Sequence, residues 1–312
     1  MIPLTLLTML GLVAAQNIPI VDAIPIAAVR DAYPSVSPDG QRLLFHSNRS
    51  GSNQIYVVGI DGSGLKRLTD YPEGSLTAKW SPDGKTIVFT RGADQTSDIW
   101  LMDADGGHPR ALMVTPGDDS HPQWTPDGQS IVFNTSRPAP SSTRDKPEFW
   151  DDIHIVRRDG SGMRRITDCK SVCTYPSLSP DGKRLAYRRV ETTVGYDWTL
   201  KSVATNSEVF VVDIDGGGEK NLSHDPAFDG WPSWSPDGRW IAFASNRGRV
   251  AYAAQIYVIH PDGSGLKQIT AGSWSHTQPA WARDDRSLYV YRSQETADTE
   301  TGVVARVPLS LP

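Results

Sequence analysis

The sequence predicts an all-β fold: a six-bladed β-propeller of four-stranded antiparallel blades, whose ring is closed by an N-terminal strand that completes the last blade. Three observations predict it. A Ser-Pro-Asp-Gly turn recurs along the chain, its copies begin 44 to 56 residues apart, and short apolar runs separated by further Asp-Gly turns fill the intervals. This spacing is the length of a propeller blade, and Asp-Gly between apolar runs is a strong hairpin signal.

Each copy of the repeat has the same order of elements. The turns begin at Ser37, Ser81, Thr125, Ser179 and Ser235, with a degenerate sixth copy at Ala282. Proline sets φ near −65° in such a turn, and glycine takes the position that needs a positive φ. An apolar strand, a variable loop, a third strand, a second Asp-Gly turn and a fourth strand follow. Such a meander is apolar on both faces, so the copies must stack on one another and close a ring.

The six predicted blades comprise about residues 31–70, 75–115, 119–168, 173–224, 228–271 and 275–312. The last blade stops after three strands. We expect residues 24–30, with the sequence IPIAAVR, to supply its fourth strand, because this segment precedes the first blade and an open sheet edge would otherwise remain. Burial of its aliphatic side chains would contribute about 1.5 to 3 kcal/mol each.

Residues 1–15, MIPLTLLTMLGLVAA, are apolar over a length too short to span a bilayer and end in small residues. We interpret them as a secretory signal peptide, which predicts a secreted or periplasmic protein without a membrane span. A buried apolar N-terminus is the alternative, since no Lys or Arg precedes the apolar run. The formal net charge of −5 disfavours nucleic acid as a partner, because its backbone requires clustered basic side chains.

The only two cysteines, Cys169 and Cys173, lie close together in the sequence. In an oxidising compartment they would close a disulfide around a very small loop, which is worth roughly 2 kcal/mol. Two free thiols are the alternative. A zinc site is disfavoured, since a second pair of ligands with suitable spacing is lacking.

The repeat P-x-W-S-P-D-G, followed by I-x-F, S-x-R, I-Y-V-x-x-x-D-G and L-T, resembles the six-bladed propeller domain of TolB and the WD-like repeat proteins related to it. The resemblance covers nearly all of residues 24–312. It implies an exported protein that binds other proteins. In TolB an α/β domain precedes the propeller, whereas here the first blade directly follows the predicted signal peptide. Similar propellers also occur as accessory domains of serine peptidases and as polysaccharide lyases.

The residues that enter the first strands are expected to point toward the mouth of the central channel. They are Asp31, Tyr33, Thr77, Asp119, His121, Tyr175, Asp229, Trp231, His276 and Gln278. Chain direction places them on the face opposite the Ser-Pro-Asp-Gly turns. Among them we expect Tyr33, His121, Tyr175, Trp231 and His276 to bind a protein partner or a polar ligand.

The loops after the second strands of the third and fourth blades are long, at residues 136–152 and 190–207. Each carries a tryptophan among charged residues, Trp150 in the first and Trp198 in the second. Exposed aromatic and charged side chains on a rigid ring are typical of binding surfaces. Alternatively, each loop folds over its own blade and hides its tryptophan. Arg137 is a further binding candidate, although an arginine recurs at this place in every blade and would then pair neighbouring blades.

We therefore predict a monomeric binding or scaffolding module without a cofactor that captures a protein partner or a polar ligand on its loop-rich face. The alternative is an enzyme, a metal-assisted lyase or hydrolase with Asp119, His121, Asp229 and His276 as catalytic candidates and a divalent metal in the channel mouth. The sequence contains no G-x-S-x-G elbow, phosphate-binding loop or H-E-x-x-H motif.

Overall fold

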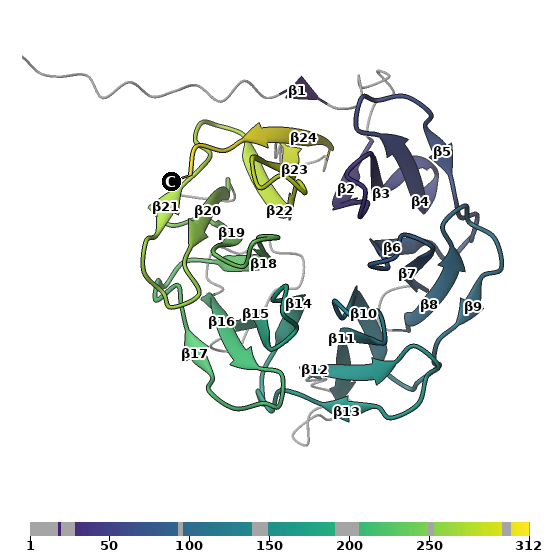
Figure 1. The fold of residues 1–312 in the computed structure, drawn as a ribbon, viewed down its shortest axis with the longest axis horizontal. Helices are drawn as coiled ribbons and strands as arrows, with labels where there is room; N and C mark the ends of the chain where they lie inside the picture. Colours follow the sequence, from purple (N-terminus) through teal and green to yellow (C-terminus); the bar gives the residue numbers. More distant parts are fainter. Residues whose placement is uncertain are drawn as a thin grey trace, which may run out of the picture.

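The structure, a computed structural model, describes residues 18–19, 29–92, 96–138, 149–190, 206–248, 253–294 and 301–311. Its regular elements in these ranges are all β-strands, and they form six antiparallel four-stranded sheets arranged around one axis (Figure 1). The predicted fold class is confirmed. Within the same ranges, no helix offers the length and apolar character that a membrane crossing requires.

The first three blades follow one another along the chain. Blade 1 contains β2 (Asp31–Val36), β3 (Arg42–Ser50), β4 (Ser52–Gly59) and β5 (Lys66–Arg67). Blade 2 contains β6 (Ser75–Trp80), β7 (Thr86–Arg91), β8 (Asp98–Asp103) and β9 (Arg110–Ala111). Blade 3 contains β10 (Asp118–Trp124), β11 (Ser130–Pro138), β12 (Phe149–Arg157) and β13 (Arg164–Arg165). The first strand of each blade lies nearest the ring axis (Figure 1).

The last three blades complete the ring. Blade 4 contains β14 (Cys173–Leu178), β15 (Arg184–Val190), β16 (Ser207–Asp213) and β17 (Lys220–Asn221). Blade 5 contains β18 (Asp229–Trp234), β19 (Ile241–Ser245), β20 (Gln255–Ile259) and β21 (Lys267–Gln268). Blade 6 contains β22 (Ser275–Trp281), β23 (Ser287–Ser293) and β24 (Gly302–Pro308), and β1 (Ile18–Pro19) is its fourth strand. The first and last blades are therefore neighbours (Figure 1).

The Ser-Pro-Asp-Gly turns are stabilised by their own side chains. In blade 1, Ser37 Oγ donates a hydrogen bond to Asp39 Oδ1 at 2.5 Å and accepts one from Arg42 N at 2.9 Å. Gly40, with φ at 72°, donates its N–H to Ser37 O at 2.9 Å. The positive φ explains the glycine, and the aspartate satisfies the turn. The repeated Asp-Gly of this turn is thus structural.

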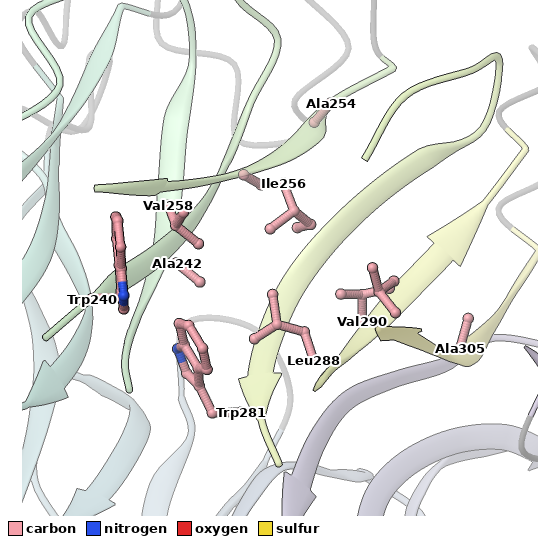
Figure 2. Close-up of a cluster of buried hydrophobic side chains, with 11 residues drawn as sticks. Trp240, Ala242, Ala254, Ile256, Val258, Trp281, Leu288, Val290 and Ala305 are labelled. Atoms are coloured by element: carbon pink, nitrogen blue, oxygen red, sulfur yellow. The ribbon is translucent and has the colours of Figure 1, made fainter. Parts of the chain in front are cut away.

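The hydrophobic core lies between neighbouring blades. Figure 2 shows one cluster, to which blade 5 contributes Trp240, Ala242, Ala254, Ile256 and Val258 and blade 6 contributes Trp281, Leu288, Val290 and Ala305. Trp281 Nε1 also donates a hydrogen bond to Ser233 O of blade 5 at 2.8 Å. A fully buried aliphatic side chain contributes about 1.5–3 kcal/mol, so this packing holds each blade to the next.

The ring closes through an N-terminal strand, but at an earlier position than the expected residues 24–30. Ile18 pairs with Arg306 and Pro19 pairs with Ala305, antiparallel to β24. In the other blades, six or seven residues cross from the outermost strand to the first strand of the next blade. A strand ending at Arg30 would leave no residues for this crossing before β2. Arg30 instead forms a parallel bridge to Gly302, and residues 24–28 lie outside the described residues.

Cys169 and Cys173 are joined by a disulfide that links the segment before β14 to the first residue of that strand. Both cysteines are buried in the cluster between blades 3 and 4. The Cys169 N–H also donates a hydrogen bond to Asp152 Oδ1 at 2.9 Å. The crosslink therefore reinforces the crossing from blade 3 into blade 4.

Candidate functional site

Every first strand carries a β-bulge at the same position. In blade 1 the register shifts between Ala32 and Ser35, and the corresponding shift occurs in the other five blades. One residue of each bulge has a left-handed backbone with φ between 50° and 59°: Tyr33, Thr77, His121, Tyr175, Trp231 and Gln278. Left-handed backbone is unfavourable for such side chains, so the surrounding fold imposes it. Bulges re-aim side chains, and these six line a common cavity of about 70 Å³ at the ring axis.

Four of these residues pack together across the channel; we call Tyr33, His121, Tyr175 and Trp231 the aromatic cluster. The His121 ring lies 5.5 Å from the Tyr33 ring and 4.5 Å, edge-on, from the Tyr175 ring, between centroids. The Tyr175 and Trp231 centroids are 5.3 Å apart. All four side chains are half-buried. The aromatic cluster therefore connects blades 1, 3, 4 and 5 and leaves part of its ring surface accessible.

A hydrogen-bond chain orders the aromatic cluster. Trp231 Nε1 donates to the Tyr33 hydroxyl at 3.1 Å, and that hydroxyl lies 3.3 Å from His121 Nε2. His121 Nδ1 lies 3.1 Å from Asn134 Oδ1. Burial lowers the pKa of His121 to about 3, so its imidazole is neutral at pH 7. With the proton on Nδ1, the ring donates to Asn134 and its Nε2 accepts the Tyr33 proton.

The catalytic candidates other than His121 lie outside the channel cavity. Asp119 and Asp229 are fully buried; they accept hydrogen bonds from Thr115 Oγ1 at 2.7 Å and from Arg247 Nη2 at 2.6 Å, respectively. His276 is buried, with Nδ1 3.3 Å from Gln255 Oε1. None of these three lines the channel cavity, contrary to expectation. The bulge follows each of them, so the residue two positions later points to the other side of the strand and into the channel.

The enzyme alternative requires a divalent metal in the channel mouth. Within the described ranges, no three His, Cys, Asp or Glu side chains are grouped so that they could hold a metal ion. Burial raises the pKa of Asp229 to about 6, and the Arg247 guanidinium opposes this rise. The raised pKa of Asp229 thus originates in its burial, which outweighs the ion pair with Arg247.

Three of the six recurring arginines pair with an aspartate of their own blade, and a fourth, Arg91, pairs with Glu73 in the crossing from the preceding blade. Arg49 binds Asp31 at 2.6 Å, and Arg137 lies 3.4 Å from Asp119, each pair inside a single blade. The expectation of pairing between neighbouring blades applies to Arg188, which lies 5.6 Å from the centre of the Phe228 ring. Arg137 is therefore engaged by the fold, although its side chain is 36% exposed.

The structure describes one of the two loop tryptophans. Trp150 is half-buried in β12, where it pairs with Arg137 of β11. This pairing lies beyond Asp118 and Ser136, which face each other where β10 begins, so Trp150 is on the face where the first strands start. Trp198 lies outside the described residues.

Lys79 was not among the predicted site residues, yet it lines the channel. It occupies the position two residues before the Ser-Pro-Asp-Gly turn. The six equivalent residues are Ser35, Lys79, Gln123, Ser177, Ser233 and Ala280, and each lines one of the two cavities on the ring axis. An alignment of the repeats at this position would have shown that Lys79 is its one charged residue.

Solved structures with the same fold include both TolB proteins and an enzyme. TolB from Acinetobacter baumannii superposes with a TM-score of 0.65 and 23% identity over 81% of this chain and 57% of that one. A putative TolB from Agrobacterium tumefaciens has a TM-score of 0.65 and 20% identity over 91% and 92%. An oligogalacturonate lyase in complex with manganese has a TM-score of 0.55 and 14% identity over 96% and 97%. At these identities the likeness shows the fold alone.

Similar sequences match parts of this chain. The uncharacterized protein Atu1656 of Agrobacterium fabrum is 33% identical over 105 residues, or 33% of this chain and 31% of that protein. The TolB homolog of Chlorobium luteolum is 30% identical over 126 residues, or 31% of this chain and 29% of that protein. The chain thus matches about a third of the length of these relatives.

The TolB beta propeller domain family matches residues 24–96 and 198–306. These ranges cover more than half of the chain and include the Ser-Pro-Asp-Gly repeats of blades 1, 2, 5 and 6. Together with the six-bladed ring, this match shows that the chain belongs to the TolB β-propeller domain family.

Proposed function

We propose that this protein is an exported binding module that captures a protein partner on its loop face. We define the loop face as the end of the ring where β2, β6, β10, β14, β18 and β22 begin and where β11 and β15 end. The observation that supports it best is the aromatic cluster at the centre of this ring. The apolar residues 1–15 support the exported location, secreted or periplasmic.

The aromatic cluster has the properties of a binding anchor. Aromatic side chains supply most of the binding energy at many protein interfaces, because a large rigid ring buries much area at a small entropic cost. Here the Trp231–Tyr33 hydrogen bond and the ring contacts hold the side chains before any partner arrives. Preorganisation of this kind lowers the entropic cost of association. A partner that inserts an apolar or aromatic side chain into the channel mouth would use these rings.

The outer part of the proposed surface comes from blades 3 and 4. Arg137 and Trp150 lie side by side on paired strands at the loop face, and each side chain is partly exposed. We place both in the binding surface, with Trp198 added from the sequence. A guanidinium beside an indole can receive a carboxylate and an apolar group together, which suits a protein partner or a polar ligand.

An enzyme remains the second candidate function, since the manganese-bound oligogalacturonate lyase shares the fold. Its support is weaker. Asp119, Asp229 and His276 are engaged by separate partners, Thr115, Arg247 and Gln255 respectively, and do not converge with His121. General acid–base catalysis requires groups within reach of a common substrate.

The experiment is capture of partners from an extract of the native host by the tagged protein, followed by quantitative binding of the captured partner. Trp231→Ala and His121→Ala should each weaken capture about tenfold or more, because interface anchors are worth about 2 kcal/mol or more. Leu266→Ala is the matched control: it removes an apolar side chain that is 44% exposed next to the Asp-Gly turn on the opposite face.

Trp231→Phe separates folding from binding, because it retains most of the packing while it loses the indole N–H. The proposal is wrong if folded Trp231→Ala and His121→Ala proteins capture the same partner as strongly as Leu266→Ala. Stoichiometric metal in the purified protein, lost with His121→Ala, would favour the enzyme instead.

A further inference from the structure

The channel contains a cation, Lys79, that has no counterion among the described residues. Lys79, in β6, is half-buried and lines both the 70 Å³ cavity below the aromatic cluster and a larger cavity on the opposite side. Its ammonium forms no hydrogen bond or ion pair with any residue in the described part of the chain. An ammonium withdrawn from water without a partner is unfavourable, and burial accordingly lowers the pKa of Lys79 to about 8.

The larger cavity, which we call the turn-side cavity, opens where the Ser-Pro-Asp-Gly turns meet. It has a volume of about 480 Å³ and receives side chains from all six blades. Five blades place the proline of the turn in its wall: Pro38, Pro82, Pro126, Pro180 and Pro236. The degenerate sixth turn has Arg283 at the equivalent position, and this residue also lines the cavity.

The turn-side cavity is therefore positive. Lys79 and Arg283 are the charged side chains among the described residues that line it, and neither Asp nor Glu is among them. Both cations stand at positions that the other blades fill with neutral residues. Among the described residues Arg283 makes one long hydrogen bond, from Nε to Ser37 O at 3.3 Å, which leaves its terminal N–H groups for other partners.

Uncharged donors accompany the two cations. Gln123 follows Lys79 around the ring at the equivalent position of β10, and Ser35 precedes it in β2. Neither side chain makes a hydrogen bond within the part of the chain that the structure describes. An amide and a hydroxyl beside an ammonium form the donor set that recognises an oxyanion.

We propose that the turn-side cavity binds a small organic anion through a carboxylate or phosphate group that pairs with Lys79, receives hydrogen bonds from Gln123 and Ser35, and enters past Arg283. The volume is in the range of small-molecule sites, so a compact dicarboxylate or a sugar acid fits this chemistry. The site lies at the other end of the channel from the loop face and does not depend on the partner proposed there.

The test is calorimetric titration of the intact protein with succinate and, separately, inorganic phosphate, at constant ionic strength set by chloride. At least one should bind saturably at one site. Lys79→Met should weaken binding about tenfold or more, because a charge-assisted hydrogen bond is lost. Lys79→Arg should retain binding, and Lys85→Met, which removes an exposed lysine of the same blade, should leave it unchanged.

The pH dependence distinguishes ion pairing from a structural role of Lys79. The other ionisable groups that line the two cavities are Tyr33, His121, Tyr175 and Arg283. Burial raises the pKa of both tyrosines and lowers that of His121 to about 3, so none of these three changes charge between pH 7 and 9. The Arg283 guanidinium stays protonated in proteins. Affinity should therefore fall as the pH rises past the pKa of Lys79, and Lys79→Arg should abolish this fall.

Each outcome either supports or overturns the proposed anion site. Binding of succinate alone identifies a carboxylate site, and binding of phosphate identifies a site for phosphate or phosphorylated ligands. The proposal is overturned if neither anion binds, or if Lys79→Met binds as tightly as Lys85→Met. Circular dichroism of each variant establishes that the ring is folded, and the conservative Lys79→Arg protein keeps the test decisive if Lys79→Met does not fold.

Discussion

Lys79→Met should stabilise the protein at neutral pH. Burial lowers the pKa of this ammonium from 10.5 to about 8, and a shift of one pKa unit corresponds to about 1.4 kcal/mol. The charged form therefore costs up to about 3 kcal/mol of folding free energy, an upper bound because the half-buried ammonium keeps some contact with water. Methionine has a similar length and no charge, so the substitution removes this cost.

The sign of the pH dependence follows from proton binding. Between pH 8 and 10.5 the unfolded chain binds more protons at Lys79 than the folded protein, so stability rises with pH in this window. The cost is fully present below pH 8 and absent above 10.5. The advantage of Lys79→Met over wild type should accordingly shrink as the pH increases from 7 to 10.5.

The assay is chemical denaturation of wild type, Lys79→Met and Lys85→Met in chloride buffer at three pH values between 7 and 10.5. Lys85 is exposed in the turn after β6, so its substitution should change stability by less than about 0.5 kcal/mol. A Lys79→Met protein that is less stable than wild type by the same amount at every pH would refute the reasoning, since it would mean that Lys79 makes a stabilising contact.

Three further predictions concern the ring and its channel. Tyr33→Phe removes the acceptor of the Trp231 indole N–H, so it should lower the free energy of unfolding by about 1–3 kcal/mol in denaturant titration. Acidification from pH 6 toward 3.8 should stabilise the wild type by up to about 3 kcal/mol, because the raised pKa of Asp229 makes the folded state hold this proton more tightly. Asp229→Asn should abolish this gain, which thermal melts at several pH values measure. Deletion of residues 1–19 should lower the stability by about 1–2 kcal/mol relative to deletion of residues 1–15, since it removes the Ile18–Pro19 pairing; equal melting temperatures of the two truncations would contradict this.

Much of the candidate site could be predicted because the repeat aligns equivalent positions. Tyr33, His121, Tyr175 and Trp231 occupy one position of the repeat, and ring closure brings one position of every blade to the same axis. The same reasoning was wrong for Asp119, Asp229 and His276, which precede His121, Trp231 and Gln278, respectively, by two positions. Regular pleating would point residues two apart to one side, but the left-handed bulge breaks this alternation. None of the six left-handed residues is a glycine, so the sequence does not reveal the conformation.

The sequence by itself determined the six blades, their turns and the neighbours of each blade, because turn chemistry and apolar periodicity are local properties that repeat about every 50 residues. Only the tertiary structure decided the directions and partners of the channel side chains. It paired three of the recurring arginines, Arg49, Arg137 and Arg247, with aspartates of their own blades and moved the closing strand to Ile18–Pro19. It also placed Lys79 in a cavity whose described lining residues include no carboxylate. These features depend on contacts between residues far apart in the chain, which no local pattern encodes.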